Sequence, residues 1–336
     1  MTRLMSLVTL LLLLSLVACA PPTAAPAPAA QEAPTEAPAA EEMPTLKIGT
    51  QAWIGYGPWW IAKEKGFFEA HGIHVELIDF VTDQDLNAAL AAGRFDGANI
   101  ATHTSAYLIN AGVDLKLVLL EDASFEADAI IAGEGIETIA DLKGKQVAYE
   151  EGTTSDLLLN YALMQNGMSL DDIIPVHMPA ADAGAAAVAG KVDAAVTYEP
   201  YISAALSKGE GYRIIYSAAA KPGLIGDFLA FPQSVLEEKG DQVRAMLLAW
   251  QDAMDFLAEH PDEGQQIIAD AVGSDIEEFK VAWQGIKLYD LAENREQFAG
   301  PIQETYREVM SVLLATGAVE SVPEPEDVLD PSYLPE

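Results

Sequence analysis

The chain has 336 residues, of which 50% are hydrophobic and 21% are charged. This composition is typical of a soluble protein with a well-developed core, and the length is sufficient for two domains. Aspartate and glutamate number 52 against 18 lysines and arginines, which gives a formal net charge of −34 at pH 7. Because nucleic-acid phosphates would repel so acidic a chain, we exclude nucleic acid as a partner.

Residues 1–19 have the pattern of a lipoprotein signal peptide. An arginine near the start precedes an apolar run that is too short for a membrane-spanning helix. The run ends in the sequence LVAC, which resembles the bacterial lipobox, and Cys19 is the only cysteine of the chain. We therefore expect Cys19 to carry the lipid and to become the mature N-terminus. A buried cysteine in an ordinary apolar region is the alternative.

Residues 20–44 are rich in proline, alanine and glutamate and show no apolar periodicity. Such low-complexity sequence predicts a disordered, extended tether. A lipid anchor, a tether and a globular body together predict an extracytoplasmic protein that is anchored to the cell membrane, on its periplasmic or outer face.

From residue 45 onward, short apolar strands alternate with helices, which predicts an α/β fold with a largely parallel sheet. After residue 228 the pattern changes to long helices. The expected strands cover residues 45–53, 74–80, 95–100, 115–121, 145–151, 172–179, 193–199 and 212–217. The expected helices cover residues 58–73 with a break at Gly66, and residues 83–93, 104–112, 153–167, 182–190, 240–260, 261–272, 274–286 and 295–317.

An internal repeat divides this body. Residues 90–105 (LAAGRFDGANIATHTS) and 187–200 (AVAGKVDAAVTYEP) both show a helix, a glycine stop, a strand and a polar or aromatic loop. The repeat predicts two α/β lobes of similar build. Ligands of open α/β sheets bind beyond the carboxyl ends of the strands, so a cleft between the lobes is expected there.

No catalytic or cofactor motif is present. The chain lacks G-x-S-x-G, the P-loop, G-x-G-x-x-G after a strand, and H-E-x-x-H. His71 and His74 flank a helix–strand turn, where surface positions are more plausible than a shared metal site. We therefore predict no cofactor, no metal and no enzymatic activity.

The loops at strand ends hold aromatic and hydroxyl side chains, which suit an organic ligand. Trp59 and Trp60 are adjacent, so at most one of them faces a cleft. Two loops, residues 103–105 and 152–155, also begin helices. Their free N–H groups could hold an oxyanion, or their serines and threonines could simply cap the helices.

Four segments resemble the substrate-binding proteins of nitrate/sulfonate/taurine-type ABC importers and the related thiamine-pyrimidine-precursor proteins (the NMT1/THI5-like family). They are WIAKEKGFFEAHGIHVEL, AALAAGRFDGA, IADLKGKQVAYEEGTTS and AGKVDAAVTYEPYISAA. The resemblance covers about residues 46–271 and implies a type II periplasmic-binding fold, in which two Rossmann-like lobes close on one small ligand. It places lobe 1 at residues 45–130 and 223–336 and lobe 2 at residues 131–222, with crossovers near 129–133 and 217–227.

The same resemblance implies a set of ligand contacts, to which we add Glu199 because it follows Tyr198 in one loop. The set is Trp53, Tyr56, Thr82, Thr102, His103, Phe125, Gly152, Thr153, Thr154, Tyr198, Glu199 and Asp227. Several carboxylates, such as Asp128 and Glu150, also lie at or near these loops, with no lysine or arginine clearly among them. This environment favours a nitrogen heterocycle or an amine over a bare anion.

These features predict a monomeric, lipid-anchored solute-binding component of an ABC importer. It would capture a nitrate-, sulfonate- or taurine-like solute, or a thiamine-precursor or pyrimidine-like one, and deliver it to the permease. An alternative is an enzyme of the pyrimidine-precursor-synthase branch. That branch relies on a cysteine-rich iron-binding motif, whereas the one cysteine here lies in the lipobox. A ligand-sensing surface lipoprotein is a further alternative.

Overall fold

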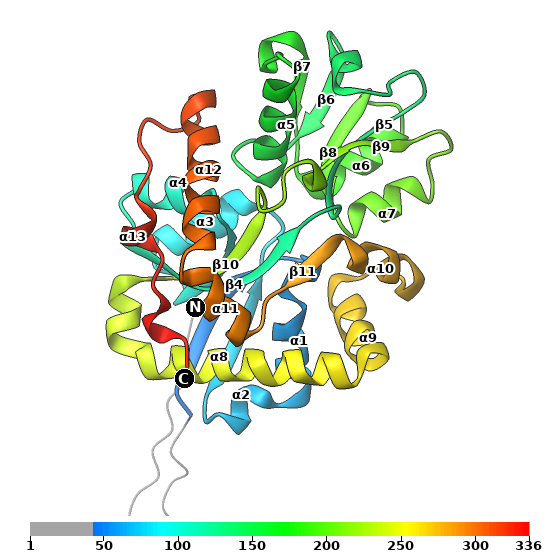
Figure 1. Ribbon diagram of the computed structural model, residues 1–336. Coiled ribbons are helices and arrows are strands. Elements are labelled where there is room, and N and C mark those ends of the chain that lie inside the picture. The colour runs from blue at the N-terminus through cyan, green and yellow to red at the C-terminus, as the bar shows by residue number, and fades with distance from the viewer. Residues whose placement is uncertain (1–42, 336) are drawn as a thin grey trace, which may run out of the picture. The chain divides into compact units, whose positions relative to one another are not determined.

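A computed structural model describes residues 43–335. The expected signal peptide, the expected lipidation site Cys19 and all but the last two residues of the expected tether lie outside the described residues. Two sheets with helices on their faces belong to one compact unit, as Figure 1 shows. Among residues 43–335, no helix is both long enough and apolar enough to cross a membrane.

The first sheet has six strands in the order β11-β4-β10-β3-β1-β2. Strands β1, β2 and β3 are parallel, whereas β10 runs antiparallel to β3 and β4, and β11 runs antiparallel to β4. The strands are β1 (Thr45–Thr50), β2 (His74–Asp79), β3 (Gly97–Ala101), β4 (Leu115–Ser124), β10 (Gly226–Pro232) and β11 (Ile286–Leu288).

The second sheet has five strands in the order β7-β6-β8-β5-β9. Strands β6, β7 and β8 are parallel, and β5 runs antiparallel to β8 and β9. The strands are β5 (Asp128–Ala132), β6 (Gln146–Tyr149), β7 (Ile174–His177), β8 (Ala194–Tyr198) and β9 (Arg213–Ser217). Both sheets therefore join parallel strands to antiparallel return strands, which confirms the expected α/β class.

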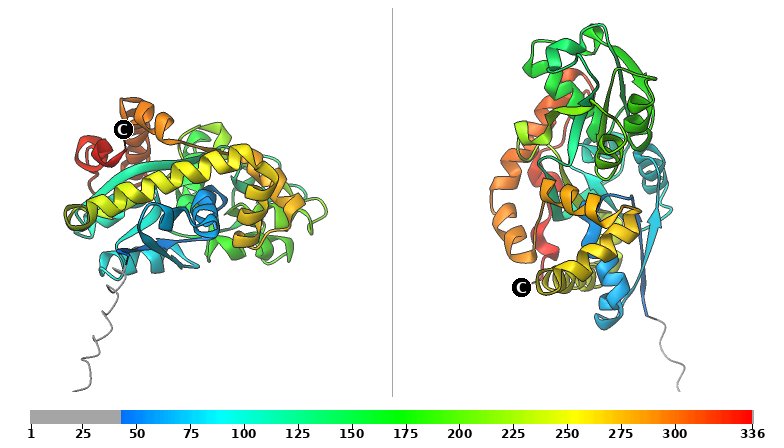
Figure 2. Two further views of the ribbon diagram at one scale, coloured as in Figure 1. Left: turned by 90° about the horizontal axis from the view of Figure 1, so that it is seen from below. Right: turned by 90° about the vertical axis from the view of Figure 1, so that its right-hand side faces the viewer.

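Helices cover both sheets. Helix α8 runs below the first sheet, while α5, α6 and α7 accompany the second (Figures 1 and 2). The helices are α1 (Gly57–Lys65), α2 (Phe67–Ala70), α3 (Asp83–Ala91), α4 (Thr104–Asn110), α5 (Thr154–Gln165), α6 (Ala180–Val188), α7 (Tyr201–Leu206), α8 (Gln233–Glu259), α9 (Pro261–Val272), α10 (Ile276–Ala282), α11 (Leu291–Phe298), α12 (Pro301–Thr316) and α13 (Pro325–Val328). Short 3₁₀ turns are η1 (Ile54–Tyr56), η2 (Ile139–Leu142), η3 (Leu170–Asp172), η4 (Ala218–Ala220), η5 (Trp283–Gly285) and η6 (Pro331–Tyr333).

The break expected at Gly66 within residues 58–73 is confirmed, because Gly66 adopts the left-handed conformation (φ 73°) that ends α1. Three expected helices differ from the structure. The helix expected at 240–260 begins earlier, because α8 starts at Gln233 and continues through a kink at Lys239. The helix expected at 295–317 is two helices, α11 and α12, and the second begins at Pro301, which cannot continue a preceding helix. The end of the helix expected at 274–286 leads into β11, which the sequence pattern did not predict.

The chain crosses between the sheets at residues 125–127 and returns at residues 218–225. The first crossing precedes the expected one, because residues 129–132 are fully buried and pair with β8 inside the second sheet. We therefore place the first lobe boundary at residues 125–127 rather than after residue 130. Below, lobe 1 is the part built on the first sheet and lobe 2 the part built on the second.

Candidate ligand-binding site

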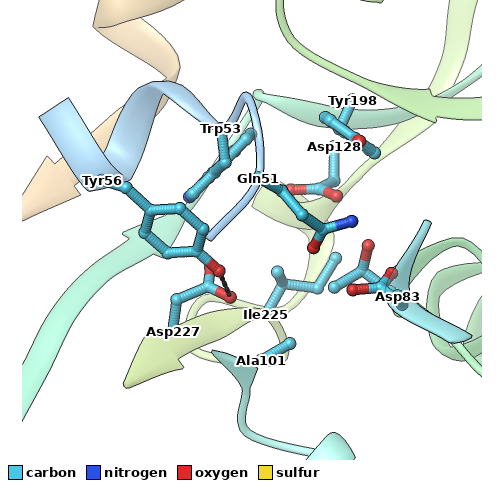
Figure 3. A pocket seen from close by; sticks show the side chains of 10 residues that line it. Gln51, Trp53, Tyr56, Asp83, Ala101, Asp128, Tyr198, Ile225 and Asp227 are labelled. Carbon is cyan, nitrogen blue, oxygen red and sulfur yellow. Dashed lines mark hydrogen bonds between the residues drawn. The ribbon is translucent and has the colours of Figure 1, made fainter. Parts of the chain in front are cut away.

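A pocket lies between the two lobes (Figure 3). Lobe 1 contributes the carboxyl ends of β1 and β3, the start of α3 and the start of β10, whereas lobe 2 contributes the start of β5, the start of α5 and the end of β8. The lining residues are Gln51, Trp53, Tyr56, Asp83, Ala101, Asp128, Thr154, Tyr198, Ile225 and Asp227. The return strands β5 and β10 are antiparallel, so their first residues reach the edge where the parallel strands end.

The pocket is narrow in this conformation. Its cavity volume is about 30 Å³, and by a comparable measure a single water molecule needs roughly 10 to 15 Å³. The space therefore fits a compact head group better than a bulky ring system.

Aromatic rings from both lobes meet at the pocket. The rings of Trp53 and Tyr198 lie edge to face, with centroids 5.8 Å apart and planes at 82°. Tyr198 also packs against Tyr201 at the start of α7, at 5.3 Å. This geometry is a favourable one for aromatic pairs. Because Trp53 belongs to lobe 1 and Tyr198 to lobe 2, their contact depends on the lobes being close together.

Two consecutive carboxylates of β4 position the tryptophans that follow β1. The indole Nε1 of Trp53 donates to Oδ2 of Asp122 at 2.9 Å, and that of Trp59 donates to Glu121. Trp59 is buried against Trp250 and does not line the pocket. Trp60 does not line it either, so neither of these adjacent tryptophans is a pocket residue. Trp53 is the one held at the pocket wall.

Three carboxylates from three different elements line the pocket. Oδ1 of Asp227 accepts a hydrogen bond from the Tyr56 hydroxyl at 3.1 Å. The Gln51 amide, in the orientation that satisfies both of its polar atoms, donates to Oδ1 of Asp83 at 2.7 Å. Asp128 is only 4% exposed, and its Oδ2 has no hydrogen-bond partner among the described residues.

Burial raises the pKa of these carboxyls. The pKa of Asp128 rises to about 7, and so does that of Asp83, whose carboxylate faces the pocket although the residue as a whole is half-buried. The pKa of Asp227 lies well above its ordinary value because of burial and then the neighbouring Asp122. Asp122 and Asp227 are direct partners in the pairing of β4 with β10, and two such close carboxyls do not ionise together easily.

Positive charge is missing from this cluster. No lining residue is a lysine, arginine or histidine. Within residues 43–335, none of the ion pairs involves Asp83, Asp128 or Asp227. The same part of the chain contains no group of three or more His, Cys, Asp or Glu residues arranged to hold a metal ion. The pocket is therefore rich in carboxyl oxygens, and no cationic side chain among its lining residues balances them.

Five of the twelve ligand contacts expected from the sequence line the pocket, namely Trp53, Tyr56, Thr154, Tyr198 and Asp227. The other seven do not line it in this conformation. They are Thr82, Thr102, His103, Phe125, Gly152, Thr153 and Glu199.

Most of these seven have structural partners. Thr82 and Thr153 cap helices α3 and α5, so the capping alternative describes residues 153–155 well. The hydroxyl of Thr102 donates to the Gly226 carbonyl at 2.7 Å. The Glu199 carboxylate accepts from both the backbone N–H and the hydroxyl of Ser203.

Of the remaining three residues, two use their backbone N–H groups in hydrogen bonds within the protein, and the third is buried. The N–H of Phe125 donates to the Gly285 carbonyl at 2.8 Å, and the N–H of Gly152 donates to Oδ2 of Asp156 at 3.0 Å. His103 is 1% exposed, and burial lowers its pKa to about 4. His103 is therefore a neutral, buried side chain at physiological pH.

Five lining residues were not among the expected contacts: Gln51, Asp83, Ala101, Asp128 and Ile225. Asp128 was noted only as a carboxylate near the cleft loops. A charged residue that directly opens a buried strand, as in DAIIA (β5), is a signal that could have singled it out. Asp83 directly follows Thr82, which was expected to contact the ligand, so the expected contact and the observed lining residue differ by one position.

Two lobes with a pocket between them define the fold of the periplasmic binding proteins. The alkanesulfonate-binding protein of Xanthomonas axonopodis pv. citri, solved with bound MOPS, has this fold, with a TM-score of 0.73 and 22% identity over 87% of this chain and 100% of that chain. Residues 39–273 match the NMT1-like family, and the chain belongs to that family.

Relatives of known sequence agree with this assignment. A protein of Brucella abortus (strain 2308) that is named as a binding protein is 31% identical over 215 residues, which are 62% of this chain and 65% of the relative. A protein of Escherichia coli (strain K12) named as an aliphatic sulfonates-binding protein is 30% identical over 201 residues, 59% of this chain and 62% of the relative. The chain thus spans slightly less than two thirds of these relatives.

Proposed function

We propose that this protein is the solute-binding component of an ABC importer. The observation that carries the proposal is the pocket between the lobes, in which Trp53 of lobe 1 and Tyr198 of lobe 2 face each other. Membership of the NMT1-like family and the similarity to proteins named for sulfonate binding support it. A solute held between these rings would contact both lobes at once.

Capture occurs by hinge closure in this proposal. The two crossings at residues 125–127 and 218–225 are the chain connections about which the lobes can rotate. Opening separates Trp53 from Tyr198 and admits the solute, and closing brings the rings onto it. The closed, solute-loaded form would then deliver the solute to the permease, which is the proposed partner here.

We propose binding rather than catalysis. In the alternative, the pyrimidine-precursor-synthase branch, chemistry depends on a cysteine-rich iron site, and Cys19 is the only cysteine of this chain. The LVAC sequence and the tether support anchoring of the protein to the outer or periplasmic face of the cell membrane, where we propose that it acts as a monomer. A ligand-sensing surface lipoprotein would share the pocket and the anchor but would have no permease.

Native mass spectrometry of the full chain, purified without refolding, tests the binding role. We expect a retained small molecule that denaturation releases. We also expect the ligand-free protein to show a rise in melting temperature with at least one solute class among sulfonates, nitrate, pyrimidines and amines. Tyr198→Ala should reduce both signals, whereas Tyr212→Ala, a lobe 2 tyrosine outside the pocket, should retain them. No retained molecule and no thermal response to any class would refute the proposal.

A further inference from the structure

The polar atoms that line the pocket belong mainly to acceptors. Asp83, Asp128 and Asp227 each present a carboxylate, and no cationic side chain lies among the lining residues. An unpaired cluster of carboxylates does not by itself make a site, because carboxylates at a protein surface are usually solvated.

Asp128 provides the second, independent observation. The residue is 4% exposed and lines the pocket, yet its Oδ2 has no hydrogen-bond partner among residues 43–335. Buried polar atoms in proteins are normally hydrogen-bonded, so an unpartnered carboxylate oxygen on a residue that lines a cavity indicates a missing donor. The hydroxyls of Ser124 and Thr154 lie near the Asp128 carboxyl, but neither makes a hydrogen bond to Oδ2, so a ligand that enters the pocket can supply the donor.

We infer that the ligand is a small organic cation with N–H donors, a protonated amine, amidine or guanidine, whose head group donates to Asp128 and Asp83 between the rings of Trp53 and Tyr198. This inference rests on the proposed function and adds the charge and chemical class of the solute. Hydrogen bonds between ionised partners are about twice as strong as neutral ones. The aromatic rings add cation–π attraction for a positive head group.

An anionic head group does not fit these residues. At pH 8, above the pKa of about 7 of Asp83 and Asp128, a sulfonate, as in the MOPS bound to the Xanthomonas protein, would meet two ionised carboxylates and leave the oxygen of Asp128 unpaired. A quaternary ammonium would satisfy the charge but has no N–H to donate. The structure therefore separates this chain from relatives named for sulfonates in the sign of the ligand charge, while the fold stays the same.

The surroundings of the two carboxylates favour a cation as well. Asp83 faces Glu150 and Asp128, and Asp128 faces Glu199, so every charged neighbour that acts on the pair is acidic. Burial together with these neighbours keeps protons on the two carboxyls near neutral pH. A bound cation would replace those protons, so binding should release protons to the solvent.

Isothermal titration calorimetry of the ligand-free full chain at pH 8 provides the test. The probes are putrescine and agmatine as N–H cations, tetramethylammonium as a quaternary cation, and ethanesulfonate and nitrate as anions. We expect binding of at least one N–H cation, binding of tetramethylammonium at least tenfold weaker, and no binding of either anion. We also expect the mass of any retained molecule to correspond to an amine, amidine or guanidine.

Asp128→Asn keeps the size of the side chain but removes the charge and should weaken binding of the N–H cation at least tenfold. Glu134→Gln removes one charge from an exposed loop residue outside the pocket and should leave the affinity for the N–H cation unchanged. Two outcomes would overturn the inference and leave the proposed function standing. One is that ethanesulfonate or nitrate binds as tightly as the best amine, and the other is that tetramethylammonium binds with equal affinity. Failure of every probe, with no retained molecule, would overturn the proposed function itself.

Discussion

The hydroxyl of Tyr56 donates to Oδ1 of Asp227 at 3.1 Å and joins two residues that lie 171 positions apart in the chain. Tyr56 belongs to the turn η1 after β1, and Asp227 to the return strand β10, which arrives only after lobe 2 is complete. The bond fixes one carboxylate at the pocket wall and leaves Asp83 and Asp128 to face the ligand.

Tyr56→Phe removes the donor of this bond. Leaving a buried carboxyl without its hydrogen-bond partner lowers stability by about 1 to 3 kcal/mol. We therefore expect the free energy of unfolding in urea to fall by that amount. Tyr56→Phe combined with Asp227→Leu should cost less than the sum of the two single changes, because the pair is lost together. Strict additivity in this double-mutant cycle would show that the bond contributes nothing.

Asp122→Asn tests how the tryptophan at the pocket wall is held. The asparagine oxygen can still accept from Nε1 of Trp53, while one carboxyl beside Asp227 is gone. We therefore expect the ligand-free protein to gain stability at pH 8. Trp53→Phe keeps a ring but orphans Asp122, and it should lower both stability and ligand affinity. A loss of stability with Asp122→Asn at pH 8 would contradict this account.

The raised pKa of Asp128 makes stability depend on pH. Its folded-state value is about 7 against an ordinary 3.8, so between these values the folded protein holds a proton that the unfolded chain has lost. This contribution is fully present below about pH 4 and disappears as pH rises through 7. A shift of this size corresponds to roughly 4 kcal/mol. Asp83 acts in the same direction.

Asp128→Asn should remove this contribution. Measured by urea unfolding without ligand, the variant should be more stable than the unaltered protein at pH 8, and this advantage should shrink toward pH 5. An equal difference at both pH values would argue against a protonated Asp128. A group that lowers stability while it serves binding is a common compromise at functional sites.

Gly97 allows β3 and β10 to approach closely. A Cβ at this position would lie 2.4 Å from the Phe231 ring and 2.7 Å from the Ala230 carbonyl. We expect Gly97→Ala to destabilise the protein by about 1 to 3 kcal/mol, as overpacking in a core does. Gly300→Ala is the control, because a Cβ there meets nothing within 4 Å. Similar melting temperatures for both variants would contradict the packing argument.

Lipidation can be tested by fractionating cells that express the full chain. We expect the protein in the membrane fraction, and Cys19→Ser in the soluble extracytoplasmic or secreted fraction with the signal peptide altered in processing. Incorporation of labelled palmitate should follow the same pattern. Membrane association that survives Cys19→Ser would show that another feature holds the protein at the membrane.

The sequence predicted the alternation of strands and helices because each buried strand is a short apolar run between turns. It missed the antiparallel return strands β5 and β10 and also β11, whose three residues after a helical pattern carry no period of their own. Trp53, Tyr56, Tyr198 and Asp227 were expected at the site from the family resemblance, and the first three also lie in loops at expected strand ends. Asp128 and Asp83 were missed because burial of a carboxylate depends on what the other lobe places beside it. The residues next to Asp128 and Asp83 in the sequence do not indicate which side chains of the other lobe will lie beside them.

The position of β10 has a consequence for folding. It is the centre of the first sheet, and without it and β11 the strand β4 has no partner in that sheet. Lobe 2, by contrast, is one continuous stretch whose five strands all lie within residues 128–217. We therefore expect lobe 2 to form first. Until β10 is added, β3 and β4 have strand edges with unpaired backbone groups, and such edges are prone to aggregation. A chain that stops before residue 226 would contain one complete sheet and another that lacks its centre.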